Sequence, residues 1–162
     1  MSGTAVADHS GPMFEPAQRP IAGCELCRSP GGRLVTSQGA WRVIRVDDAD
    51  FPAFYRLVHR EHVAEMSDLS AVERTRCLEW LVGIEQTLRE VLAPTKINLA
   101  SLGNMVPHLH WHVIARFDWD SHFPQPVWAT RQREAAGGQL ARLREALPTV
   151  DTRLAALFHS AG

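Results

Sequence analysis

Cysteines are scarce in this 162-residue chain, which holds only Cys24, Cys27 and Cys77. So few thiols cannot build the dense disulfide framework of a small secreted domain, and we expect a cytoplasmic protein in a reducing compartment. An excess of one charge is also missing, because 17 basic and 18 acidic side chains leave a net charge of -1. This balance argues against a nucleic acid polymer or a membrane as partner, while a local pocket for a small anion is allowed.

Long apolar runs are missing from residues 1–22, where Gly, Ser and Pro stand in a polar background. The segment fits neither a secretory signal nor a membrane anchor, and we expect it to be a flexible N-terminal tail. Hydrophobic residues nevertheless make up 45% of the chain, which is enough for a core of ordinary size. We expect one main domain over residues 23–129, followed by a C-terminal helix and tail over residues 130–162.

Periodicity in the main domain predicts a mixture of strands and helices. Short runs that are rich in β-branched and aromatic residues predict strands at 41–46, 54–59, 97–102 and 106–115. Apolar residues at helical spacing then predict one long helix that begins after Ser70, with Glu73 completing a capping box, and ends at Pro94. A final helix is expected from about residue 130 to 147, with an interruption at Gly137 and Gly138.

Three histidines alternate with apolar residues in the run His108-Leu109-His110-Trp111-His112. Because side chains on a strand alternate between faces, the three imidazoles are expected to project to one side and the apolar residues toward the core. Three imidazoles in a row are a poor choice for a purely structural surface, since each needs a partner and charged forms repel one another. The pattern therefore indicates a functional site.

Nucleophilic attack on phosphorus is the chemistry that such a row favours. A neutral imidazole is a good nucleophile when one neighbour orients it and another neutralises charge on the phosphoryl oxygens. His110 has a neighbour on each side and is the natural nucleophile, while His112 can donate a hydrogen bond to the phosphoryl oxygens. His108 is expected to steady the site or to help protonate the leaving group. Because imidazoles and backbone amides supply the charge relief, no catalytic cofactor is required.

The run 104–112, Asn-Met-Val-Pro-His-Leu-His-Trp-His, resembles the signature of the histidine triad family, in which a Gln usually stands at the position of Asn104. The segment 57–63, which ends in His62-Val63, resembles the strand end that precedes the long helix of that family. The resemblance extends over residues 24–128. It implies an α+β fold with an antiparallel sheet of about five strands, a long helix, a C-terminal helix and a homodimer joined through the sheets.

The same resemblance implies a reaction. The middle histidine, here His110, attacks the α-phosphate of a nucleoside phosphoramidate, an adenylate or a dinucleoside polyphosphate, and the nucleotidyl-histidine is then hydrolysed or passes its nucleotide to an acceptor. The expected partner is a purine nucleotide or another nucleoside phosphate. Because the Asn104 side chain is shorter than that of Gln, the resemblance does not define which leaving group is preferred.

The pair Cys24-Glu25-Leu26-Cys27 has the spacing of half a zinc site, although ordinary buried thiols or a loop turn explain such a pair equally well. Some bacterial members of the histidine triad family complete a zinc site with two histidines. By resemblance these are His62 and His108, which would make the zinc structural.

Other side chains flank the three histidines. Asn98, Ser101 and Asn104 lie on or beside the strand before them and are candidates for binding ribose or phosphate, although local turn and cap hydrogen bonds are an alternative for Ser101 and Asn104. Three aromatic residues can either wall a base pocket or pack in the core: Phe51, Phe54 and Tyr55.

Two further hypotheses compete with the nucleotide hydrolase. In the first, two histidines two residues apart on a strand ligate a catalytic zinc ion, but no carboxylate stands within this strand to complete the site. In the second, the chain is a nucleotide-binding module without activity, against which an intact His110 counts.

Overall fold

A computed structural model describes residues 11–160 and has α+β architecture with one sheet of five strands. The strands are β1 (Arg33–Gln38), β2 (Trp41–Arg45), β3 (Phe54–His59), β4 (Lys96–Ala100) and β5 (His110–Arg116). They lie in the order β1-β2-β3-β5-β4, and each neighbouring pair is antiparallel. The helices are α1 (Glu25–Arg28), α2 (Ala71–Leu92) and α3 (Gly137–Ser160), with a 3-10 turn at Met66–Asp68.

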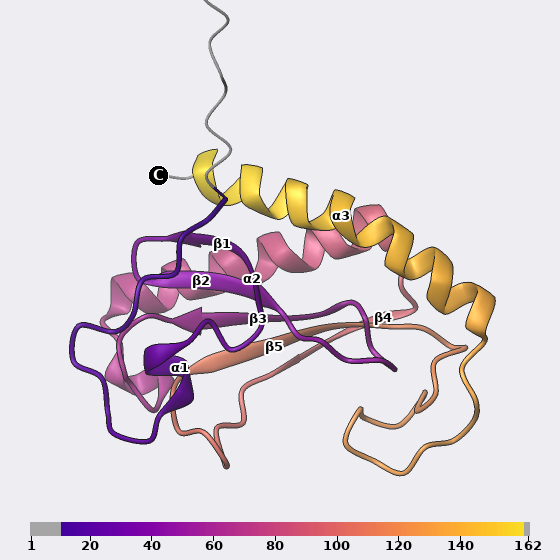
Figure 1. Ribbon diagram of the computed structural model, residues 1–162, viewed down its shortest axis with the longest axis horizontal. Helices are drawn as coiled ribbons and strands as arrows, with labels where there is room; N and C mark the ends of the chain where they lie inside the picture. The colour runs from indigo at the N-terminus through magenta and orange to yellow at the C-terminus, as the bar shows by residue number, and fades with distance from the viewer. Residues whose placement is uncertain (1–10, 161–162) are drawn as a thin grey trace, which may run out of the picture.

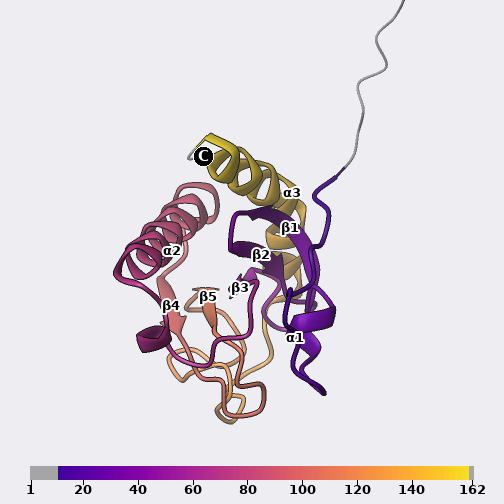
Figure 2. The same cartoon turned by 90° about the vertical axis from the view of Figure 1, so that its left-hand side faces the viewer.

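The two long helices cover one face of the sheet, and α1 lies against the other (Figures 1 and 2). Of the strands, β2 and β4 agree with the sequence-based prediction to within two residues at either end, and β3 agrees with it fully. Strand β1 was not predicted. It forms a hairpin with β2 in which Gln38 pairs with Trp41, and Gly39 provides the positive φ of 57° that this tight turn requires.

The predicted strand at 106–115 is wrong at its beginning, because β5 starts only at His110. Pro107 has no amide hydrogen to donate to a ladder. The amide of His108 then donates to the carbonyl of Val106 at 2.8 Å, which bends the chain locally. His108 is therefore not part of the regular strand that carries His110 and His112.

Helix α2 has the start and end that its sequence predicts. The Ser70 hydroxyl accepts from the amide of Glu73, and the Glu73 carboxylate accepts from the amide of Ser70. The helix ends at Ala93, which has a left-handed backbone, directly before Pro94. Six residues of the helix are buried, mostly at helical spacing: Cys77, Trp80, Leu81, Ile84, Thr87 and Leu88.

The prediction for the last helix is wrong at both ends, because α3 begins at Gly137 and continues through Pro148 to Ser160. Before the helix, the amides of Gln132 and Arg133 donate to the carbonyl of Ser121, so this stretch is held as an irregular chain. Beyond Pro148 a buried apolar stripe continues and outweighs the one hydrogen bond that proline removes. The stripe comprises Leu143, Leu147, Val150, Leu154 and Phe158.

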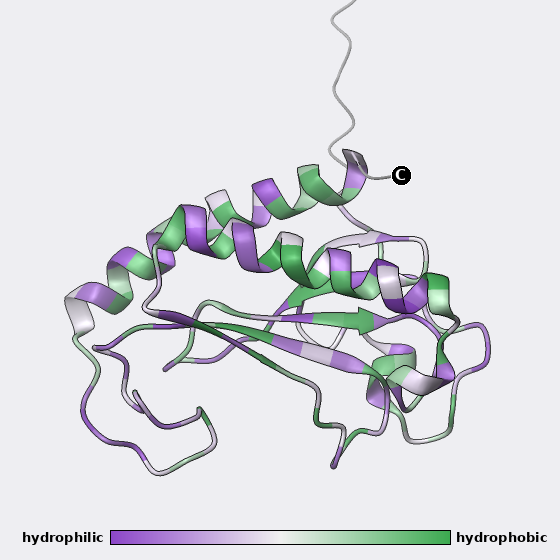
Figure 3. Ribbon diagram, turned by 180° about the vertical axis from the view of Figure 1, so that it is seen from behind, coloured by the Kyte–Doolittle hydropathy of each residue, from purple (hydrophilic) through white to green (hydrophobic). Residues whose placement is uncertain are grey.

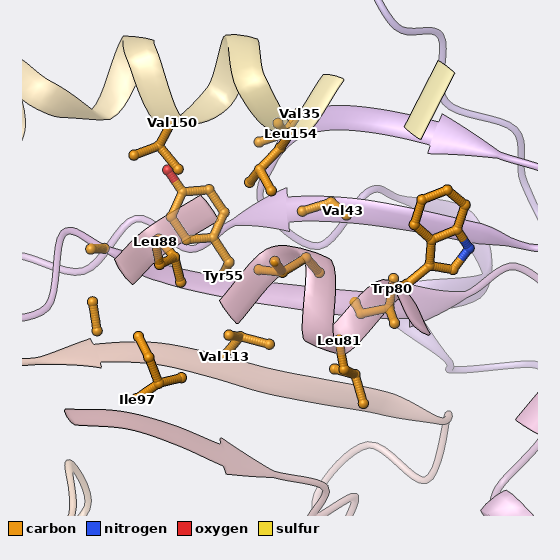
Figure 4. Close-up of a cluster of buried hydrophobic side chains, with 14 of the residues drawn as sticks. Val35, Val43, Tyr55, Trp80, Leu81, Leu88, Ile97, Val113, Val150 and Leu154 are labelled. Atoms are coloured by element: carbon orange, nitrogen blue, oxygen red, sulfur yellow. The ribbon is translucent and has the colours of Figure 1, made fainter. Parts of the chain in front are cut away.

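The main core lies between the sheet and the two long helices and contains side chains from all five strands and from α2 and α3; ten of them are labelled in Figure 4. Trp80 of α2 stacks on Phe158 of α3, with ring centroids 3.7 Å apart. Tyr55 is fully buried in this core, and its hydroxyl donates to Asp151 of α3 at 2.8 Å. Seen from behind, apolar and polar residues alternate along both long helices, as expected for helices with one buried side (Figure 3).

The other face of the sheet carries α1 and the preceding residues. In the segment expected to be a flexible tail, residues 1–10 lie outside the described residues, whereas residues 11–22 contact the domain. The amide of Ala17 donates to the carbonyl of Cys27 at 3.1 Å, and the amide of Gln18 donates to the Glu61 carboxylate at 3.0 Å. In the described part of the chain, none of the helices has the length and apolar character needed to cross a membrane.

Candidate functional site

Strand β5 presents His110 and His112 on the sheet face opposite the long helices. The intervening residue, Trp111, and the next odd-numbered one, Val113, point to the helix side and belong to the core there. The rings of His110 and His112 are adjacent, with centroids 5.0 Å apart. The alternation predicted from the sequence thus holds for the second and third histidines of the triad.

A cavity of about 610 Å³ opens beside these two imidazoles. Its polar lining consists of Glu25, Arg56, Asn104, His110 and His112, and its apolar lining includes Leu26, Leu102, Met105, Val106 and Trp128. Met105 and Trp128 are largely exposed at their positions in this lining. The cavity lining therefore combines two imidazoles and other polar groups with apolar side chains, which suits a ligand with one anionic and one aromatic part.

His110 is held in one tautomer. Its Nδ1 lies 2.6 Å from the carbonyl oxygen of His108, which can only accept a hydrogen bond, so Nδ1 carries the proton. Burial lowers the pKa of His110 and so does the charge of Arg56, although the bond to the carbonyl acts in the opposite direction. The result is a neutral imidazole whose Nε2 has a free lone pair, as a nucleophile needs.

His112 is also neutral at physiological pH. Burial and the positive charge of Arg56 lower the pKa of His112 to about 4, and nearby His110 contributes in the same direction. Its ring lies 5.2 Å from that of Phe54, which forms a small apolar cluster with Phe51 and Ile114 on this face of the sheet. Of the three aromatic residues considered from the sequence, Phe54 thus borders the site, whereas Tyr55 packs on the helix side.

His108 faces away from the cavity, toward the two cysteines of the N-terminal segment. It is fully buried, and its Nδ1 lies 3.4 Å from the Sγ of Cys24 and 3.5 Å from that of Cys27. Its Nε2 lies 2.6 Å from the carbonyl oxygen of His59. The structure therefore separates the first histidine of the triad from the other two.

The four residues that the sequence suggested as zinc ligands come together. Donor atoms of Cys24, Cys27, His62 and His108 all lie within 4.8 Å of one another, and the Sγ of Cys27 is 3.4 Å from the Nδ1 of His62. Zinc bonds of about 2.3 Å to sulfur and about 2.0 Å to nitrogen, at tetrahedral angles, place the two ligands about 3.5 Å apart. The observed spacing fits such a site, so the group can hold a metal ion.

The candidates for ribose or phosphate binding fall in different places. Asn104 lines the cavity beside His110 and His112. The side chain of Asn98 accepts a hydrogen bond from Arg116 at 2.9 Å, and the hydroxyl of Ser101 donates to the carbonyl of His110 at 3.1 Å. Asn98 and Ser101 thus form hydrogen bonds within the protein, and Ser101 supports the backbone of His110 from the neighbouring chain segment.

Arg56 was missed from the sequence, although it lines the cavity and pairs directly with His112 across β3 and β5. The signal that could have found it is a charged residue at the middle of the apolar run Phe54-Tyr55-Arg56-Leu57-Val58. Strand alternation places it on the same face as Phe54, but only the strand pairing shows that this is the face of the histidines.

Residues 32–119, more than half of the chain, match the model of the HIT domain family. The chain therefore belongs to the histidine triad family, as its signature indicated. Membership in this family supports nucleotide binding and hydrolase or transferase chemistry in general. None of the curated proteins matches the sequence closely enough to be counted as a relative.

Solved structures of bacterial proteins share the fold. A histidine triad protein of Bradyrhizobium japonicum is 30% identical, with a TM-score of 0.61 over 74% of this chain and 90% of that chain. One of Marinobacter aquaeolei is 27% identical, with a TM-score of 0.62 over 78% of this chain and 93% of that chain. One of Sinorhizobium meliloti is 25% identical, with a TM-score of 0.61 over 77% of this chain and 88% of that chain.

Proposed function

We propose that this protein is a nucleotide hydrolase or nucleotidyl transferase that acts at the α-phosphate of a nucleoside phosphoramidate, an adenylate or a dinucleoside polyphosphate. The observation that carries the proposal is the hydrogen bond from Nδ1 of His110 to the carbonyl oxygen of His108, at 2.6 Å. It fixes the tautomer whose Nε2 is a nucleophile, at the wall of a cavity large enough for a nucleotide.

The reaction has two steps. In the first, Nε2 of His110 forms a bond to the α-phosphorus, and the bond from phosphorus to the leaving nitrogen or oxygen breaks. The leaving atom takes up a proton from water in the cavity, and the neutral ring of His112 can donate a hydrogen bond to a phosphoryl oxygen from the same cavity wall. In the second step, a water molecule attacks phosphorus and passes a proton to bulk water, the bond from phosphorus to Nε2 breaks with its electron pair returning to Nε2, and a nucleoside monophosphate departs. In a transfer, an acceptor hydroxyl or phosphate replaces the water.

We also propose that Cys24, Cys27, His62 and His108 hold a structural zinc ion. The support is the closeness of the four donor atoms, which all lie within 4.8 Å of one another, together with the hydrogen bond from His108 to the carbonyl of His59, which is typical of a metal-bound histidine. A zinc ion held here would tie the N-terminal segment to the chain just before β5. The role of His108 is then to bind the metal and, through its carbonyl, to orient His110.

The direct test is turnover of adenosine 5′-phosphoramidate by the parent protein and by His110→Ala. We expect the variant to lose at least about a thousandfold in kcat/KM, because no other group in the cavity replaces the nucleophile. His159→Ala is the matched control, since His159 is exposed on α3 far along the chain from the cavity. The urea midpoints of both variants should equal that of the parent.

Full activity in His110→Ala would overturn the assignment of the nucleophile. Binding of the nucleotide without turnover by the parent, for each of the three substrate classes, would favour a nucleotide-binding module without activity. Both results are readable from one panel of substrates, with release of nucleoside monophosphate as the measurement.

A further inference from the structure

Three arginines lie on the sheet face that carries His110 and His112, and two of them donate hydrogen bonds within the protein, although Nη1 of Arg42 is buried without an acceptor. Arg42 of β2 donates to the backbone carbonyls of Leu26, Ser29 and Pro30. Arg116 of β5 forms two hydrogen bonds of 2.8 and 2.9 Å to the Asp120 carboxylate, and further bonds to Asn98 and Gln125. These two guanidinium groups have structural roles that account for their burial.

Arg56, between them on β3, differs. Within residues 11–160, no hydrogen bond or ion pair joins its side chain to another residue, and its Nε is buried without an acceptor. The guanidinium carbon lies 5.3 Å from the centre of the Phe54 ring, and the side chain lines the cavity of His110 and His112. Burial lowers the pKa of Arg56, and the charge of Glu25, which lines the same cavity, opposes this shift without a hydrogen bond between the two side chains. A half-buried guanidinium with unused donors is costly unless an acceptor binds to it.

The position of Arg56 identifies what it can bind. Among the residues that line the cavity it is the one Arg or Lys, and it pairs with His112 across β3 and β5. Nδ1 of His110 is already bonded to the carbonyl of His108, so this ring has no second N–H to offer a phosphate. A guanidinium is permanently charged and offers a planar fork of donors that matches two phosphoryl oxygens.

We propose that Arg56 binds the non-bridging oxygens of the phosphate that His110 attacks, and thereby makes the site selective for phosphorylated over neutral nucleosides. This inference rests on the proposed function for the identity of the phosphate. Arg56 then supplies a permanent positive charge beside the phosphate, in a lining that also contains the carboxylate of Glu25. The Phe54 ring below the guanidinium keeps the fork facing the cavity.

The experiment measures dissociation constants of AMP and of adenosine by calorimetry for the parent, Arg56→Met and Arg56→Lys. Methionine keeps an apolar stem over Phe54 and removes the charge, so we expect AMP to bind at least about tenfold more weakly and adenosine to bind as in the parent. Lysine should fall between the two for AMP, because it keeps the charge and loses the fork. Arg153→Met, at an exposed site on α3, is the control and should change neither constant.

Equal weakening of AMP and adenosine in Arg56→Met, or no weakening of either, would overturn the inference. The first result would mean that Arg56 shapes the cavity wall, and an unfolding curve of the variant shows whether the fold itself has changed. The outcome is separable from that of the proposed function. If Arg56→Met selectively loses AMP binding but the parent hydrolyses none of the substrates, phosphate binding by Arg56 is supported and the hydrolase function is contradicted. If the parent hydrolyses a substrate but Arg56→Met binds AMP as the parent does, the hydrolase function is supported and phosphate binding by Arg56 is contradicted.

Discussion

Two histidines that are two positions apart, His108 and His110, have opposite surroundings. Both ring nitrogens of His108 are engaged, one with the cysteine sulfurs and one with the carbonyl of His59. Only Nδ1 of His110 is engaged, and its Nε2 is left for the cavity. We infer that in this structure a side chain whose hydrogen-bonding atoms all have partners has a structural role. A side chain with an unused donor or acceptor beside a cavity is instead available for binding or chemistry.

The same contrast separates the arginines of this sheet face. Arg116 is 2% exposed and bonded on all sides, whereas Arg56 has unused donors beside the imidazoles. The comparison makes a separate prediction for each kind of side chain. Substitution of a side chain whose donors and acceptors have partners should lower the stability of the fold. Substitution of a side chain with unused donors or acceptors at the cavity should lower ligand binding or turnover.

Removal of zinc should have the largest effect on stability. If the ion binds the folded chain alone, a free zinc concentration about a thousandfold above its dissociation constant stabilises the fold by about 4 kcal/mol. We therefore expect a chelator, or Cys24→Ser, to lower the free energy of unfolding by about that amount, as measured with urea. At urea concentrations well below the unfolding midpoint, the zinc-free protein should keep most of its turnover.

The control for this experiment is Cys77→Ala, which removes a buried thiol outside the cluster and should leave the zinc content unchanged. Loss of turnover on chelation with no change in stability would contradict the structural role and favour the catalytic-zinc alternative. The two measurements together separate the hypotheses.

Acid should weaken the engaged pair of Arg116 and Asp120. Burial alone would raise the pKa of the Asp120 carboxyl, but hydrogen bonds from Arg116 and from backbone amides outweigh it and hold that pKa below its usual value. A carboxyl whose pKa is lower in the folded state stabilises the fold above its unfolded pKa, and this stability is lost as the pH falls through the folded value. Asp120→Asn should therefore be less stable than the parent at neutral pH, and the gap should narrow in acid.

Urea unfolding of both proteins at a series of pH values, read as the difference in free energy at each pH, provides this measurement. The difference cancels the contributions of the other carboxylates. A gap that stays constant down to about pH 2 would show that Asp120 is not held ionised by its partners.

Much of the fold could be predicted from the sequence, because its signals are local. Ser70 and Glu73 mark the start of α2, and a run of aromatic and β-branched residues marks β3. The last helix could not be placed in this way, since Gly137 and Pro148 argue for interruption while a long-range apolar stripe keeps α3 intact.

The site was predictable in part for the same reason. His110 and His112 follow from strand alternation, whereas the turn at Pro107 redirects His108 toward a segment far away in the sequence. Joining His62 to the cysteines required a family resemblance, because no local pattern connects residues so far apart. Arg56 depends on which strands are neighbours, and this information lies in the sheet order rather than in any short stretch of sequence.

The central claim, attack by Nε2 of His110 on the α-phosphate, is tested most directly by acid-free rapid quenching of the protein with an adenosine phosphoramidate, followed by mass analysis of its peptides. We predict a transient increase by the mass of one adenylyl group on the peptide that contains His110, and no such increase in His110→Ala. Turnover without an adduct, or an adduct on another residue, would contradict the account.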